Sequence, residues 1–211
     1  MMKKKRSKSS KKWLKKHFND IYVQNSHKNQ LRSRAWFKLD EINKMTNLLY
    51  NKKCVVDLGA APGGWSQYVS HQFLNKKNSE IIACDRINMK KIDKVIFMQG
   101  DLTNHLFLKQ FLNYVCNKKV DLLISDMAPN ITGISSIDIP NSIFLAELAL
   151  KITKLILIKE GLFLVKIFQG TGVNQYLNLM REHFFHVKIC KPKSSSACSR
   201  EFFIIAGNKK K

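Results

Sequence analysis

The sequence predicts an α/β fold in which a mostly parallel sheet is covered by helices on both faces. Three observations lead to it: strand-like apolar runs alternate with helical patterns, acidic residues recur where the strands end, and 211 residues suffice for one sizeable core. Strands are expected at 53–57, 80–85, 94–98, 120–125 and 161–167, with helices at 64–74, 104–116, 141–158 and 173–182. Two further runs, 184–190 and 201–206, are expected to complete seven strands as an antiparallel C-terminal hairpin around a Lys/Ser-rich loop.

The chain is strongly basic, with 37 Lys and Arg residues against 15 Asp and Glu residues and a formal net charge of +22. Residues 1–38 hold 13 of the basic residues and one acid, Asp20. This favours a polyanionic partner, with RNA or DNA ahead of an anionic membrane. Codon drift in a genome biased toward A and T also enriches a protein in lysine, and it is an alternative source of part of the charge. We expect residues 1–12 to form a flexible basic tail and residues 13–211 to form a single domain.

The five cysteines include no C-x-x-C pair, so we expect a reducing compartment and no metal site. The N-terminus lacks an apolar signal segment, and charged residues interrupt the most apolar stretch, 145–168. A soluble, cytoplasmic protein is expected.

A glycine-rich turn follows the first predicted strand, in the segment Asp57-Leu-Gly-Ala-Ala-Pro-Gly-Gly-Trp-Ser-Gln-Tyr68. Glycine lets the backbone turn sharply and approach a ligand, and the amides at a helix start suit an anionic group. The segment matches neither G-x-x-x-x-G-K-[ST] nor G-x-G-x-x-G, the loops that hold triphosphates and dinucleotides. It indicates a nucleotide-cofactor site, with a ligand-free connection as the alternative.

Acidic residues lie at or just beyond the ends of four predicted strands: Asp57, Asp85, Asp101 and Asp126. Because strand ends border the ligand crevice of open α/β sheets, we expect these carboxylates at one rim, although each alone also suits a helix cap or turn. Together they would repel a pyrophosphate, which disfavours NAD, FAD and ATP. They suit S-adenosylmethionine, whose sulfonium, ammonium, ribose hydroxyls and adenine amino group are all partners for a carboxylate. Asp85 has the position of a ribose-binding acid, and Asp101 is expected to bind the adenine amino group.

Six short segments occur in order between about Trp13 and Gly207: Ser33–Leu39, Asp57–Gln67, Gln99–Asp101, Ser125–Asn130, Val165–Gly170 and Ser199–Glu201. With these segments the chain resembles the FtsJ-type RNA ribose 2′-O-methyltransferases, specifically those that modify a uridine of bacterial large-subunit ribosomal RNA. The resemblance implies a Rossmann-like, S-adenosylmethionine-dependent methyltransferase fold.

The resemblance also implies the site residues. A catalytic tetrad is implied at Lys38, Asp126, Lys166 and Glu201, with Lys166 as the proton acceptor. Cofactor contacts are implied at Gly63, Trp65, Asp85, Asp101 and Asp126. The implied target is a uridine in the A loop of 23S rRNA within the 50S subunit, with no obligate protein partner inferred. Alternatives are a transfer RNA 2′-O-methyltransferase of the same family and a catalytically inactive RNA-binding assembly factor.

Lys166 is locally anomalous, because it interrupts the apolar run Gly161–Phe168, where a lysine is rare without a function or partner. Methyl transfer to a ribose requires alignment of three atoms and removal of the hydroxyl proton. A lysine has a reference pKa of about 10.4, so it acts as a base only when buried or near another cation, such as Lys38. The alternative is a charged lysine that steers the hydroxyl. Candidates for RNA phosphate contacts are Arg32, Arg34, Lys191, Lys193 and Arg200.

Overall fold

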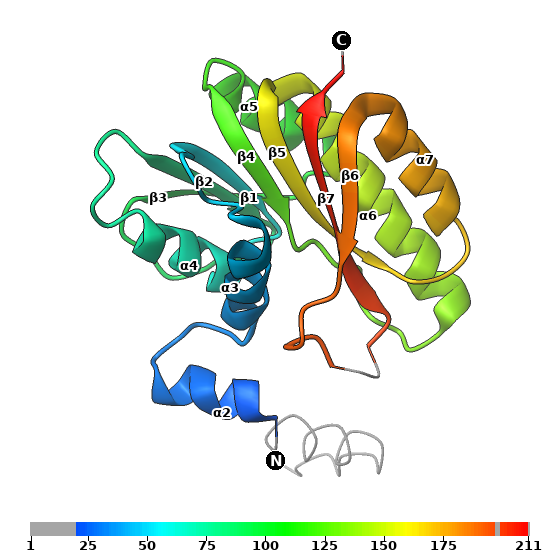
Figure 1. Ribbon diagram of the computed structural model, residues 1–211, viewed down its shortest axis with the longest axis horizontal. Coiled ribbons are helices and arrows are strands. Elements are labelled where there is room, and N and C mark those ends of the chain that lie inside the picture. Colours follow the sequence, from blue (N-terminus) through cyan, green and yellow to red (C-terminus); the bar gives the residue numbers. More distant parts are fainter. Residues whose placement is uncertain (1–19, 197–198, 211) are drawn as a thin grey trace.

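The computed structural model describes residues 20–196 and 199–210, so the predicted basic tail, residues 1–12, lies outside the described residues. The described chain forms one central sheet with helices on both of its faces (Figure 1). None of the helices in these two ranges is long and apolar enough to cross a membrane.

Seven strands form the sheet in the order β3-β2-β1-β4-β5-β7-β6. They are β1 (Cys54–Leu58), β2 (Glu80–Asp85), β3 (Val95–Gln99), β4 (Val120–Ser125), β5 (Leu157–Phe168), β6 (Phe184–Cys190) and β7 (Glu201–Lys209). Strands β1 to β5 run parallel to one another, whereas β7 runs antiparallel to both β5 and β6. The predicted seven-stranded, mostly parallel sheet with an antiparallel C-terminal hairpin is confirmed.

The second strand of the hairpin lies inside the sheet, between β5 and β6, and the first strand forms the edge. Burial explains this order. Residues 201–207 of β7 are all buried, as an interior strand requires, whereas most residues of β6 are exposed or half-buried.

The helices of the described residues are α2 (Ile21–Lys28), α3 (Ala35–Thr46), α4 (Gly64–Gln72), α5 (His105–Val115), α6 (Ser135–Ile156) and α7 (Val173–His183). Helices α3 and α4 pack on one face of the sheet, and α5, α6 and α7 pack on the other. Each face has its own hydrophobic core. Val55 belongs to the core beneath α3 and α4 and Val56 to the core beneath α5, α6 and α7, because successive side chains of a strand point to opposite faces. The helices predicted after the glycine turn are confirmed, with changed boundaries.

The largest change is in α6, which begins at Ser135 rather than at residue 141. Pro140 lies inside the helix as its sixth residue. Pro140 lies beyond the first four amides, which have no intrahelical partner, so its missing N–H costs one helical hydrogen bond, that to the Ser136 carbonyl. The Asp138 carboxylate stabilises the loop before the helix, since it accepts hydrogen bonds from the amides of Thr132 at 2.9 Å and Gly133 at 3.0 Å.

Candidate active site

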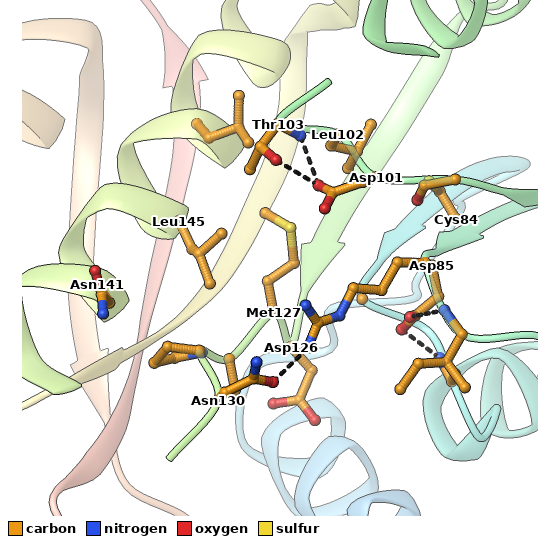
Figure 2. A pocket seen from close by; sticks show the side chains of 18 of the residues that line it. Cys84, Asp85, Asp101, Leu102, Thr103, Asp126, Met127, Asn130, Asn141 and Leu145 are labelled. Atoms are coloured by element: carbon orange, nitrogen blue, oxygen red, sulfur yellow. Dashed lines mark hydrogen bonds between the residues drawn. The ribbon is translucent and has the colours of Figure 1, made fainter. Parts of the chain in front are cut away.

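An open cavity of about 400 Å³ lies beyond the carboxyl ends of β1 to β4. Figure 2 shows three of the predicted acids, Asp85, Asp101 and Asp126, on its wall. The rest of the lining is largely apolar and includes Leu102, Met127, Phe144, Leu145 and Leu148. Such a cavity fits a cofactor that combines an apolar ring with hydroxyl groups and positive charge, and it does not fit a polyphosphate.

Asp85 and Asp101 are fixed by their own loops. The two carboxylate oxygens of Asp85 accept hydrogen bonds from the amides of Ala61 at 2.9 Å and Ile87 at 2.8 Å. Asp101 accepts from the Thr103 hydroxyl at 2.7 Å and from its amide at 2.8 Å, and these bonds lower the pKa of Asp101 below its ordinary value. Each oxygen of Asp85 retains a further lone pair, and Oδ2 of Asp101 takes no part in the Thr103 bonds, so both carboxylates can still accept from a ligand.

The glycine turn connects β1 to α4, and its residues Gly59 and Ala61 line the cavity. Gly59 has φ +76°, and a Cβ atom there would lie 2.8 Å from the Cα atom of Met127, which follows β4. Gly63 has φ +104° and is the N-cap of α4. Both positions therefore require glycine, as the sequence indicated for this turn.

Arg32 holds the same turn from outside. Its guanidinium donates to the backbone carbonyls of Pro62 at 3.3 Å, Lys90 at 2.7 Å and Lys91 at 2.6 Å. These bonds join the glycine turn to the segment that follows β2. The guanidinium that the sequence offered as a phosphate contact is thus engaged by the protein itself.

Asp57, the fourth of the predicted acids, lies inside β1 below the cavity wall and does not line the cavity. One of its oxygens accepts from the Ser66 hydroxyl at 2.6 Å, and the other has no hydrogen-bond partner among the described residues. Complete burial raises the pKa of Asp57 to about 7, and the charges of Asp126 and Asp85 act in the same direction.

The predicted tetrad forms two buried ion pairs. The Lys38 ammonium lies 2.6 Å from Oε1 of Glu201, and both side chains are about nine-tenths buried. The Lys166 ammonium lies 2.7 Å from Oδ1 of Asp126, in an ion pair without hydrogen-bond geometry, and donates to the Asp126 backbone carbonyl at 2.6 Å. Two positive and two negative side chains therefore balance each other.

Strand register brings the two pairs together. Lys166 of β5 is directly opposite Phe203 of β7, and Glu201 is two residues from Phe203 on the same face. Lys38 reaches this face from α3, with its ammonium 6.0 Å from the centroid of the Phe203 ring. Asp126 connects the quartet to the cavity, because it both pairs with Lys166 and lines the cavity wall.

Two predicted cofactor residues, Gly63 and Trp65, do not line the cavity. The Trp65 side chain is 2% exposed, donates from Nε1 to the Ala35 carbonyl at 2.9 Å, and packs against Phe203 at 5.8 Å between ring centroids. The indole therefore supports the tetrad face instead of the cavity wall. The cofactor contacts predicted at these two residues stay predictions, and the group they offer toward the start of α4 is the backbone.

The structure adds residues that the sequence reasoning missed. Arg86, which follows β2, donates to the side-chain oxygen of Asn130, which follows β4, and both residues line the cavity. Asn141 and Phe144 of α6 line it as well. The helical pattern was a signal for α6, but no local feature marks which of its side chains face a ligand.

A doubly wound sheet with an acid-lined cavity beside a buried lysine and carboxylate quartet defines a cofactor-dependent group-transfer enzyme. The sequence pattern of the FtsJ-like methyltransferase family matches residues 31–209. The chain therefore belongs to the FtsJ-like methyltransferase family, as the short segments predicted.

Solved structures agree with this fold. A Plasmodium falciparum protein named as a ribosomal RNA methyltransferase is 28% identical, with a TM-score of 0.75, and the match covers 84% of this chain and 98% of that one. Human methyltransferase-like protein 13, in complex with S-adenosylhomocysteine, is 14% identical with a TM-score of 0.53 over 76% of this chain and 73% of its own. A Streptococcus mutans protein named as a methyltransferase, also with S-adenosylhomocysteine, is 14% identical with a TM-score of 0.51, over 81% and 97%. The predicted Rossmann-like methyltransferase fold is confirmed.

Proposed function

We propose that this methyltransferase transfers a methyl group from S-adenosylmethionine to a ribose 2′-hydroxyl of RNA. The observation that carries the proposal is the place of Asp126, which borders the cavity and pairs with Lys166. A cofactor in the cavity is then adjacent to the quartet, and a ribose that reaches Lys166 lies next to the cofactor.

The cavity wall supports this choice of cofactor. S-adenosylmethionine supplies, when bound, an electrophilic methyl group on a positively charged sulfur. We assign Asp85 to the ribose hydroxyls, Asp101 to the adenine amino group and Asp126 to the positively charged end. The backbone of Gly63 and Trp65 is assigned to the methionine carboxylate, because amides in the first turn of α4 have no intrahelical partner and suit an anion.

Lys166 is assigned to the hydroxyl that accepts the methyl group. In the base role, the unprotonated Nζ of Lys166 would take the hydroxyl proton as the methyl group passes from sulfur to oxygen and the neutral thioether S-adenosylhomocysteine is left, and the resulting ammonium would be paired with the Asp126 carboxylate. The Lys38–Glu201 pair orients the ribose from the α3 side. In the alternative, Lys166 remains an ammonium, donates to the hydroxyl oxygen, and the proton leaves to water. The two cases differ in pH dependence, because only a base must first lose its own proton.

We infer that the target is a uridine in the A loop of 23S rRNA, within the 50S subunit. Support comes from the segments that resemble the bacterial enzymes, from the excess of basic residues and from the name of the Plasmodium falciparum relative. A transfer RNA target and a catalytically inactive assembly factor remain the competing functions.

The test is methyl transfer from labelled S-adenosylmethionine to three separate substrates: 50S subunits, free 23S rRNA and transfer RNA. The proposal expects label on large-subunit RNA. It also expects the phosphodiester bond next to one ribose to resist alkaline cleavage, because the 2′-hydroxyl of that ribose is methylated. Label on transfer RNA alone would change the target. The three substrates are prepared from cells that lack the enzyme, and absence of label on all of them would favour the inactive assembly factor. The Lys166→Ala variant serves as the inactive control.

A further inference from the structure

A basic loop joins β6 to β7 and lies close to the quartet, since β7 begins with Glu201. In Figure 1 this loop projects toward α2 and α3. Lys191 and Lys193 of the loop are exposed, whereas Pro192, Ser194 and Ser195 are buried. The body of the loop therefore packs against the protein. The Lys191 ammonium donates back to the Ser199 carbonyl at 2.8 Å, and Lys193 presents its exposed side chain outward.

Two charged residues of α3, one at its N-cap and one in its middle, hold the backbone of this loop. Glu41 accepts hydrogen bonds from the amides of Lys193 at 2.5 Å and Ser194 at 3.2 Å. Arg34, the N-cap residue of α3, donates to the Ser194 carbonyl at 3.3 Å. Both backbone groups of Ser194 are thus bound by charged side chains, which make the stronger class of hydrogen bond.

Helix geometry links these anchors to the quartet. Positions 34, 38 and 41 lie on one stripe of α3, because residues three and four apart are neighbours on a helix. Lys38 is the member of this stripe that pairs with Glu201. Glu41 is only about 4.5 Å farther along the helix axis than Lys38, so the loop is anchored within one helical turn of the quartet.

Helix α2 supports both anchors. The Tyr22 hydroxyl donates to Glu41 at 3.4 Å, and Arg34 forms an ion pair with Asp20, the N-cap of α2. The Tyr22 and Phe37 rings pack at 5.4 Å between centroids. The anchors are therefore held in place before any ligand binds.

We propose that Glu41 and Arg34 are positioning residues that hold the β6–β7 loop so that Lys193 contacts the RNA backbone beside the target ribose. This rests on the proposed function, which makes RNA the substrate. Exposed ammonium groups fit phosphates, which place a nucleic acid without reading its sequence. Fixing the loop in advance removes part of the entropy cost of binding. Glu41 acts through the loop, since a carboxylate that faced RNA directly would repel it.

The decisive variant is Glu41→Gln, because net charge and positioning predict opposite effects. Loss of a negative charge by itself strengthens the attraction of RNA. Loss of the loop anchor instead should raise the KM for RNA about threefold to tenfold, with kcat and the affinity for S-adenosylhomocysteine unchanged. Glu182→Gln, an exposed acid on α7, is the matched control and should leave KM unchanged or lower it.

Lys193→Ala provides an independent test, since its side chain is exposed and its removal spares the fold. It should raise KM similarly and reduce the salt slope of RNA binding by about 1. In the double variant Glu41→Gln with Lys193→Ala, the increase in KM should be smaller than the product of the two single increases, because both substitutions act through the same contact.

An unchanged or lower KM for Glu41→Gln would overturn the proposal. So would a double variant whose increase in KM equals the product of the two single increases. Should the wild type methylate no RNA, the proposed function fails on its own. The same variants, compared by RNA binding without cofactor, would still decide the role of the loop.

Discussion

Replacing Asp57 with asparagine should remove a pH-dependent loss of stability that its buried carboxyl group causes. Asp57 is completely buried in β1, and desolvation raises its pKa from 3.8 to about 7. The hydrogen bond from Ser66 opposes this rise, and the charges of Asp126 and Asp85 add to it. Asparagine keeps the shape and an acceptor for Ser66, and it cannot ionise.

The rise in pKa corresponds to roughly 4 kcal/mol, since each tenfold step in proton affinity is about 1.36 kcal/mol. In the unfolded chain the carboxyl group ionises near pH 4, whereas in the folded protein it stays protonated up to about pH 7. Between these values the folded state binds more protons, so the free energy of unfolding falls as the pH rises. Above about pH 7 the full loss is present.

Urea unfolding of the wild type and of Asp57→Asn at pH 5 and pH 8 measures this effect. The wild type should lose roughly 2.5 kcal/mol more than the variant between the two values, because other titrating groups are common to both proteins. Equal pH dependence of the two proteins would refute the reasoning and would mean that water or a cation reaches the carboxyl group.

Three further substitutions test the site. Asp85→Asn should weaken S-adenosylhomocysteine binding about 10- to 100-fold in calorimetry, because hydrogen bonds to a charged group contribute about 1.5–3 kcal/mol, while the exposed Asp93→Asn should not. Glu201→Gln leaves the buried Lys38 ammonium without its charged partner and should lower the free energy of unfolding by about 3–5 kcal/mol. A loss below about 1 kcal/mol would contradict the buried pair. Gly63→Ala would place a Cβ atom 2.8 Å from the Ile92 side chain, whereas at Gly133 the positive φ is the only obstacle to alanine. Thermal unfolding should therefore show a larger loss of stability for Gly63→Ala than for Gly133→Ala. Equal losses would contradict close packing at the turn.

The strands and the acid-lined rim were predictable because their signals are local. Short apolar runs mark β1, β2 and β4, and an acid at or just beyond each end is visible in the sequence without any knowledge of pairing. The insertion of β7 between β5 and β6 was not predicted. It depends on contacts such as Lys166 opposite Phe203, which join distant parts of the chain and leave no local pattern.

The candidate site shows the same division. The four tetrad positions followed from short segments that resemble a family, but their pairing as Lys38 with Glu201 and Lys166 with Asp126 required the structure. Glu41 has no distinguishing signal, because its partner Lys193 is 152 residues away. The family resemblance implied a cofactor contact at Trp65, which stays a prediction; that the large apolar ring packs against Phe203 in the core was visible only in the structure.

The most direct test of the central claim compares wild type and Lys166→Ala in methyl transfer to large-subunit RNA, with the product mapped for ribose methylation. We expect the wild type to place a 2′-O-methyl group on one ribose. The variant should bind S-adenosylhomocysteine with unchanged affinity and transfer at least about 100-fold more slowly, the usual effect of losing a general base. Equal rates for the two proteins, or a methyl group found on a base, would contradict the role given to the Lys166 and Asp126 pair.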